Sequence, residues 1–212
     1  MSEAEVHQRI VDSGIIAILR GIPSDSATDV VRAIAVGGID AIEITVDTPG
    51  AVEMIRRVSA EVDDVVIGAG TVLDPETARA VQLAGAEFIV TPTVNTDVIE
   101  MCNRYDTPIA TGVMTPTEAL TATEAGADFC KLFPASTVGP GHVSAINGPL
   151  SDVPLVPTGG VTLDNAAAFF EAGAVALGVG SAIVDADAMD AGEFDALTEA
   201  ATEFATLAEA HR

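Results

Sequence analysis

The chain has 212 residues, 49% of them hydrophobic, with 32 acidic and 9 basic side chains and a formal net charge of −23. The length fits one domain over residues 1–212, and the apolar content excludes an acidic disordered chain. Such a charge repels phosphate backbones and anionic lipids, so neither nucleic acid nor a membrane is an expected partner. The sequence has no apolar run of membrane length and no signal-peptide pattern, which predicts a cytoplasmic protein.

The basic residues are unusual in kind, because all but one of the nine are arginine and the exception is Lys131. Acid-rich, lysine-poor compositions resemble those of proteins from salt-accumulating cells, where salt screens repulsion between surface carboxylates. We therefore expect a salt-adapted protein, with an acidic partner-binding protein as the alternative. A lysine that is kept when nearly all others are absent needs a specific reason. The two cysteines, Cys102 and Cys130, are too few for a disulfide framework and are expected to be reduced and packed.

A short helix is predicted over Ser2–Asp12, and eight apolar runs that alternate with helical segments follow it. The predicted strands are Ile15–Arg20, Ala41–Val46, Val65–Thr71, Phe88–Thr93, Pro108–Val113, Phe129–Pro134, Leu155–Gly160 and Ala174–Gly180. Eight strand–helix units favour an α/β fold of the (β/α)8 TIM-barrel type with an extra N-terminal helix. A doubly wound open sheet is the alternative, but Leu19–Pro23 after the first strand lacks the glycine-rich dinucleotide turn of that fold.

Helix boundaries are marked by glycines and by capping residues. Glycines that close helices in the left-handed conformation are predicted in four similar segments, Gly37–Asp40, Ala84–Glu87, Ala125–Asp128 and Ala172–Val175. Helix starts are predicted where a capping residue precedes proline, at Asp74-Pro75, Thr115-Pro116 and Thr48-Pro49.

Lys131 stands inside an apolar predicted strand. Strand alternation places it on one face with Phe129 and Phe133, while Cys130 and Leu132 face the helix layer. Lys131 is therefore expected to point into the barrel. Because burial disfavours the charged ammonium, such a lysine supplies free amine that can attack a carbonyl carbon. The alternative is a structural lysine paired with a neighbouring acid.

Glu43 occupies the equivalent inner face of the second predicted strand, with Ala41 and Thr45. Burying a carboxylate is costly unless it is paired. A lysine and a carboxylate that converge on the barrel mouth indicate Schiff-base chemistry with a proton shuttle. Alternatively, Glu43 only keeps Lys131 charged.

Two glycine-rich stretches, Pro157–Val161 and Leu177–Ser181, follow the seventh and eighth strands and precede predicted helix starts. Backbone N–H groups backed by a helix dipole bind phosphate, and barrels often hold phosphate at these two loops. The three histidines, His7, His142 and His211, are too scattered to form a metal site, so we expect neither a metal nor another cofactor.

The sequence resembles the 2-keto-3-deoxy-6-phosphogluconate (KDPG) aldolases and the related 2-keto-3-deoxy-6-phosphogalactonate aldolases from about Ile15 to Ser181. The segments that carry the resemblance are Ile16–Gly21, Ile42–Thr45, Gly68–Val72, Ile89–Pro92, Lys131–Pro134, Thr158–Gly160 and Gly180–Ser181. The resemblance implies a metal-independent class I aldolase of an Entner–Doudoroff-type pathway, usually a homotrimer. Such an enzyme cleaves a phosphorylated 2-keto-3-deoxy sugar acid to pyruvate and glyceraldehyde 3-phosphate.

The resemblance also implies roles for individual residues. Lys131 is the Schiff-base lysine and Glu43 the general acid/base, Thr71 binds the pyruvate carboxylate, and Pro92 lines that pocket. The residues implied to hold the phosphate are Gly159, Gly160, Gly180 and Ser181.

One position departs from the family pattern, because many members carry arginine where this chain has Asp47. Arg20, at the end of the first predicted strand, could supply the missing positive charge to the anionic end of the substrate. The alternative is a structural ion pair between Arg20 and either Asp47 or Glu43.

The two branches of the family differ in the C4 stereochemistry of the substrate. Val156–Gly160 is similar to the gluconate type, where the Thr158 hydroxyl can meet the C4 oxygen, whereas Ala17–Ile22 and Phe133–Ser136 look closer to the galactonate type. We favour the gluconate substrate. The rival functions are another phosphate-binding barrel enzyme, such as an epimerase or a thiamine-phosphate synthase, and a non-catalytic phosphosugar binder.

Overall fold

The computed structural model describes residues 1–211, and eight parallel strands form its centre. The strands are β1 Ile15–Leu19, β2 Ala41–Thr45, β3 Val66–Gly70, β4 Phe88–Val90, β5 Ile109–Val113, β6 Phe129–Leu132, β7 Leu155–Pro157 and β8 Leu177–Val179. They pair in chain order, β8 also pairs with β1, and a bridge between Thr158 and Gly178 joins β7 to β8. The predicted (β/α)8 barrel is confirmed, and each predicted strand contains one observed strand.

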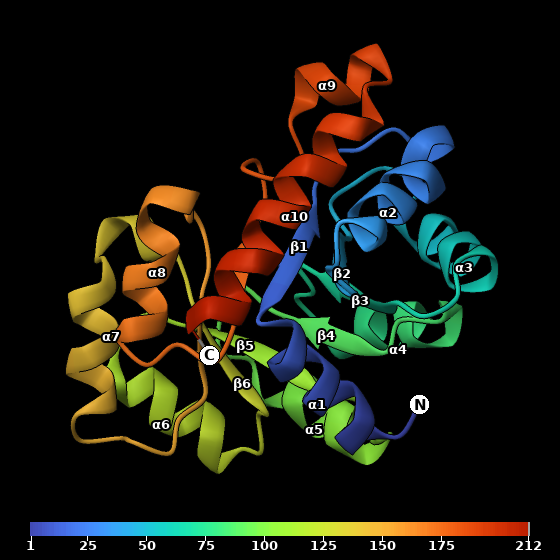
Figure 1. The fold of residues 1–212 in the computed structure, drawn as a ribbon. Coiled ribbons are helices and arrows are strands. Elements are labelled where there is room, and N and C mark those ends of the chain that lie inside the picture. The colour runs from blue at the N-terminus through green and yellow to red at the C-terminus, as the bar shows by residue number, and fades with distance from the viewer. Residues whose placement is uncertain (212) are drawn as a thin grey trace.

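Helices alternate with the strands and cover the outside of the barrel (Figure 1). They are α1 Glu3–Ser13, α2 Ala27–Val36, α3 Ala51–Glu61, α4 Pro75–Ala84, α5 Thr96–Arg104, α6 Pro116–Glu124, α7 Pro140–Asn147, α8 Leu163–Glu171, α9 Ala186–Ala191 and α10 Phe194–His211. Two 3₁₀ turns, η1 Ser24–Ser26 and η2 Ala135–Thr137, lie before α2 and α7. The predicted N-terminal helix is confirmed as α1, which begins after a capping box between Ser2 and Glu5.

Two of the three predicted helix starts are confirmed. The Asp74 carboxylate accepts a hydrogen bond from the Thr77 N–H at 2.7 Å, and Thr115 forms a capping box at the start of α6. The start at Thr48-Pro49 is wrong, because α3 begins at Ala51 after a left-handed Gly50. The Thr48 hydroxyl instead accepts a hydrogen bond from the Gly21 N–H at 2.9 Å, so it joins the loops after β1 and β2.

The four predicted glycine helix ends each contain a glycine in the left-handed region, namely Gly38, Gly85, Gly126 and Gly173. In the first of them, Gly37 keeps a helical φ of −71° and the turn is made by its neighbour. An added Cβ at Gly37 would lie 2.5 Å from Cβ of Ala201, so this glycine lets α10 pack closely on α2.

The apolar side chains of the strands form two layers. Outward-facing residues such as Ile42, Ile44, Cys130 and Leu132 pack under the helices, as strand alternation predicts. The inward-facing layer at the amino-terminal ends of the strands consists of Ile16, Ala41, Val66, Phe88, Val90, Ala110, Phe129, Val156 and Ala176. Helix α1 packs Val6 and Ile10 against this inner layer and thereby covers the lower end of the barrel.

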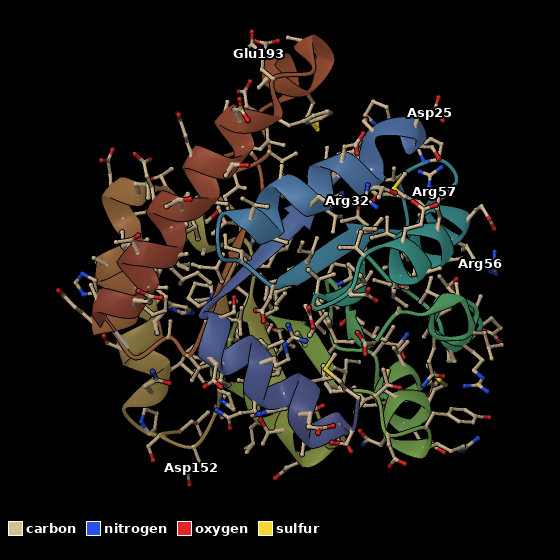
Figure 2. All side chains as sticks on the ribbon, turned by 45° about the vertical axis from the view of Figure 1, so that its right-hand side comes forward. Asp25, Arg32, Arg56, Arg57, Asp152 and Glu193 are labelled. Carbon is tan, nitrogen blue, oxygen red and sulfur yellow. The ribbon has the colours of Figure 1, made fainter. Side chains whose placement is uncertain are left out.

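Charged side chains lie at the periphery, where Asp25, Asp152 and Glu193 project from the molecule (Figure 2). Among residues 1–211, no helix combines the length and the apolar character that crossing a bilayer requires. Cys102 and Cys130 are buried free thiols, as predicted.

Candidate active site

Lys131 and Glu43 meet inside the upper half of the barrel. Lys131 on β6 is 5% exposed, Glu43 on β2 is 1% exposed, and Nζ lies 3.8 Å from Oε1 of the carboxylate. Both strands alternate as predicted, because the residues before and after Lys131, and those before and after Glu43, pack in the outer layer. The structure therefore brings the two predicted ionisable groups together out of water. A buried pair of this kind is available for proton exchange with a bound carbonyl compound.

Above Lys131 lies a cavity of about 390 Å³. The predicted residues that line it are Arg20, Lys131, Thr158, Gly159, Gly160, Gly180 and Ser181. They come from the carboxyl ends of β1, β6, β7 and β8 and from the loops that follow, where barrel enzymes place their active sites.

Arg20 has partners on both sides. One guanidinium nitrogen lies 2.5 Å from Oδ2 of Asp47, and the other donates to Oγ1 of Thr71 at 3.0 Å. The ion pair with Asp47, one of the alternatives from the sequence, is therefore present. Arg20 is still half exposed and lines the cavity, so pairing does not withdraw its charge from a ligand.

Thr71 has an unusual backbone, with a φ of +60° at the end of β3. This conformation costs a β-branched residue of the order of 1 kcal/mol or more, and such strain collects at functional sites. The strain leaves the Thr71 hydroxyl beside Arg20 at the barrel mouth.

Thr158 and Pro92 are each seated against a glycine of the following strand. A Cβ at Gly178 would overlap Oγ1 of Thr158 and lie 2.8 Å from its Cγ2, so the bare backbone of β8 makes room for that side chain. At Gly112 the close neighbour is the backbone carbonyl of Pro92 rather than a side chain, and Gly112 is the register partner of Lys131. Pro92 is thus near the lysine strand, although it does not line the 390 Å³ cavity.

Only one of the two glycine loops leads directly to a helix, whereas the sequence predicted a helix start behind both. Gly159 and Gly160 have φ of +90° and +76° and lead to α8, which starts with a capping box at Thr162. After Ser181, however, the chain turns through Val184 before the six-residue helix α9 begins. The predicted helix start directly behind the second loop is therefore wrong.

Sequence reasoning missed several cavity residues. The Phe133 ring lies 5.4 Å from Nζ of Lys131 and is 39% exposed; alternation placed it on the lysine's face but gave it no role. Val184, Ala186 and Met189 form an apolar wall from the C-terminal segment. No sequence motif marked that wall, because its position depends on how α9 packs.

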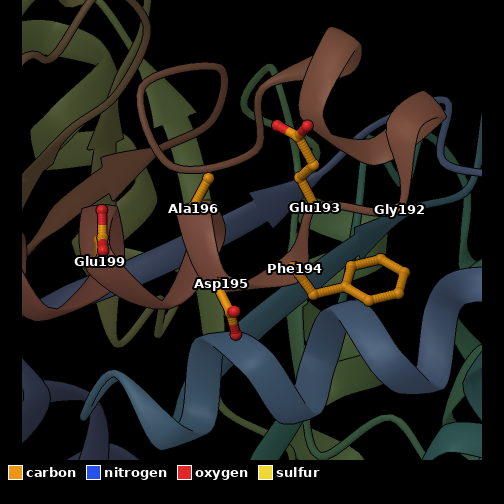
Figure 3. Close-up of a pocket in the computed structure, with 6 residues that line it drawn as sticks. All are labelled: Gly192, Glu193, Phe194, Asp195, Ala196 and Glu199. Carbon is orange, nitrogen blue, oxygen red and sulfur yellow. The ribbon is translucent and has the colours of Figure 1, made fainter.

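A second hollow, of about 520 Å³, lies at the start of α10 (Figure 3). Glu193, Asp195 and Glu199 contribute three carboxylates to its lining, and none of the predicted site residues lies there. Its charge disfavours an anionic ligand, so the cavity above Lys131 is the better candidate for a phosphorylated substrate.

Comparison with known proteins defines the class. A family model described as KDPG and KHG aldolase matches residues 6–200, which makes this barrel a lyase of the aldolase type. The chain belongs to the KDPG and KHG aldolase family.

Its relatives carry both substrate names. The chain is 42% identical over 169 residues to the 2-dehydro-3-deoxy-6-phosphogalactonate aldolase of Escherichia coli, covering 79% of this chain and 82% of that protein. It is 38% identical over 175 residues to the 2-dehydro-3-deoxy-phosphogluconate aldolase of Treponema pallidum, covering 82% and 83%. A KDPG aldolase structure from Legionella pneumophila, with pyruvate captured at low pH as a covalent carbinolamine intermediate, superposes with a TM-score of 0.87. It is 27% identical, with 93% and 96% of the two chains covered.

Proposed function

We propose that the whole chain acts as one catalytic domain, a class I aldolase that cleaves 2-keto-3-deoxy-6-phosphogluconate to pyruvate and glyceraldehyde 3-phosphate. The observation that carries the proposal is the buried Lys131 amine 3.8 Å from the Glu43 carboxylate, beneath a glycine-lined cavity. The covalent pyruvate adduct in the Legionella relative supports the same chemistry.

In this mechanism Nζ of Lys131 attacks the C2 ketone, and loss of water gives an iminium. The C3–C4 bond then breaks, and its electron pair moves into the iminium to form an enamine. Glu43 accepts the proton of the C4 hydroxyl as that carbon becomes an aldehyde, either directly or through a water molecule. Protonation of the enamine at C3 and hydrolysis of the imine release pyruvate and restore the amine.

The remaining site residues bind the two anionic ends of the substrate. We assign Arg20 and Thr71 to the carboxylate, because Arg20 lines the cavity and donates a hydrogen bond to Thr71, and we assign Pro92 to the wall of the same pocket. The backbone of the glycine loops receives the phosphate, the residues being Gly159, Gly160, Gly180 and Ser181. If Arg20→Ala changes the cleavage kinetics by less than about twofold, Arg20 is not a substrate-binding residue.

The C4 epimer is the second candidate substrate. Thr158 lines the cavity, and its buried hydroxyl, which donates to the Val156 carbonyl at 3.2 Å, is left to accept a hydrogen bond from the C4 hydroxyl; this favours the gluconate compound. The 42% identical relative, in contrast, is named for the galactonate compound. Measuring kcat/KM on the two purified epimers decides between them, and a higher value for the galactonate epimer overturns our assignment.

We also propose a homotrimer that is adapted to concentrated salt. The net charge of −23 on a chain with a single lysine supports salt adaptation, and the resemblance supports the trimer. Light scattering coupled to size exclusion, run from low salt to molar KCl, measures both properties. A monomer at every salt concentration would remove the trimer from the proposal.

The central experiment is borohydride reduction in the presence of pyruvate, followed by intact-mass measurement and peptide mapping. An adduct on Lys131 is the expected result. No adduct in folded protein would favour a non-Schiff-base barrel enzyme or a phosphosugar binder.

A further inference from the structure

Gly70, the last residue of β3, lies against the side chain of Glu43. It is the register partner of Thr45, two residues beyond Glu43 on the neighbouring strand. A Cβ built on Gly70 would overlap Oε1 and Cδ of Glu43 and lie 2.7 Å from its Cγ. The Glu43 side chain therefore leans along its strand and occupies the space that any side chain at position 70 would fill.

Backbone flexibility does not explain this glycine. Gly70 keeps a φ outside the left-handed region, so an L-residue could adopt its backbone conformation. What the position requires is close approach, one of the recurring reasons for glycine within a strand. Gly68, on the same strand, makes room for the Phe88 ring in the apolar layer below, so the two glycines accommodate different neighbours.

The Glu43 carboxylate has one oxygen without a hydrogen bond from residues 1–211 to hold it in place. Its Oε1 is buried and has no hydrogen-bond partner within the part of the chain that the structure describes. The ion pair of this oxygen with Lys131 has a separation of 3.8 Å, longer than a hydrogen bond. The recess left by the missing side chain of Gly70 is therefore available to set the direction of the carboxylate.

We propose that Gly70 is a positioning residue of the aldolase, which directs the Glu43 carboxylate toward Lys131 by leaving the recess that the carboxylate occupies. The inference rests on the proposed function, in which Glu43 transfers a proton. Glutamate is flexible, so alanine at position 70 can be accommodated by rotation of Glu43 away from the lysine. The fold then survives, and proton transfer is lost.

The test compares Gly70→Ala with Gly141→Ala, which adds the same methyl group in α7, where nothing beyond the local helix backbone lies within 4 Å of the added carbon. We expect Gly70→Ala to lower kcat by about 100-fold, the range of a general acid or base, with KM changed by less than about threefold. The control should match the parent protein. In a Glu43→Gln background, Gly70→Ala should cost less than about threefold, because there is no carboxylate left to misplace.

Equal losses from Gly70→Ala in both backgrounds, or a parent-like kcat, would overturn the inference. Thermal unfolding tests the inference even if Gly70→Ala folds poorly. The loss of Tm from Gly70→Ala should shrink in a Glu43→Ala background, and an undiminished loss would mean that the overlap is not with Glu43. Borohydride trapping with pyruvate on the parent protein keeps the two proposals separate. A missing adduct rejects the Schiff-base function, but the Tm comparison of Gly70→Ala with and without Glu43 still tests the contact between the two residues.

Discussion

The lower and upper halves of the barrel interior are built from the same strands but from opposite kinds of residue. On β2 the inward residue of the lower half is Ala41, and the next inward residue toward the mouth is Glu43. On β6 the corresponding residues are Phe129 and Lys131. Likewise, Ala110 is followed two residues later on β5 by Gly112, and Ala176, just before β8, is followed by Gly178. The lower half fills its space with side chains, whereas the upper half combines a few ionisable groups with bare backbone.

This difference separates stability from chemistry within one set of strands. Close apolar packing below supports the strands, and the missing side chains above leave room for substrate and for the functional groups themselves. A change in the lower half should therefore affect unfolding, and a change in the upper half should affect turnover. The following predictions test that division, beginning with the largest effect.

Lys131→Arg should abolish turnover, with a loss of about 10⁴-fold or more, while Tm changes little. Guanidinium remains protonated and cannot form the imine, yet it keeps a positive charge beside Glu43. A coupled assay for pyruvate and a thermal melt give the two values. Retained cleavage by this variant would mean that the upper half does not work through the amine.

Cys130 is next to Lys131 in sequence but packs in the outer layer. We therefore expect its thiol to be unreactive toward thiol reagents in the folded protein. Burial raises the pKa of the Cys130 thiol, and burial followed by the charge of Asp128 raises that of Cys102 to about 12. At pH 8 we expect thiol reagents to modify the native protein about 10³-fold more slowly than the protein in denaturant. Rapid labelling of the native protein would show that the outer layer opens.

Phe88→Ala should destabilise the lower half by about 3–5 kcal/mol, because it removes a fully buried ring. The matched change at the mouth is Phe133→Ala, where the ring is 39% exposed and contacts Lys131. We expect it to cost less stability and more activity. Urea unfolding and steady-state kinetics on both variants give the comparison, and a reversed order would break the division between the halves.

His7→Ala should have the smallest effect. The His7 ring stacks on Phe129 at 4.5 Å between centroids, a contact worth about 1 kcal/mol. Activity should not change, because the stack lies below the reactive layer. Gln8→Ala on the exposed side of α1 is the control, since it removes only a solvent-exposed hydrogen bond to Asp12. Equal losses from the two variants would show that the stack contributes nothing.

The fold could be predicted almost completely from the sequence because its signals are local. Apolar alternation placed every strand, and it placed Glu43 and Lys131 on the inner face. The prediction of a helix start failed where a residue with a local helix signal makes a tertiary contact instead. Thr48-Pro49 has the pattern of a helix start, but the hydroxyl is used by the loop after β1.

The site could be predicted only in part, because several roles depend on contacts between strands. Nothing in the sequence distinguishes Gly70 from a turn glycine until Glu43 is seen against it. The partner of Arg20 stayed open between Asp47 and Glu43 for the same reason. The apolar wall that includes Met189 depends on where the C-terminal segment returns to the mouth.

Helix α1 closes the amino-terminal end of the barrel with Val6 and Ile10. Substrate and products therefore have to enter and leave through the mouth at the carboxyl ends of the strands. In the proposed binding mode, the phosphate-bearing fragment lies at the glycine loops, nearer the rim than the fragment bonded to Lys131. We therefore expect an ordered departure, with the aldehyde leaving first and pyruvate second. Pyruvate should then inhibit competitively against the sugar acid, and an analogue of the aldehyde should inhibit noncompetitively.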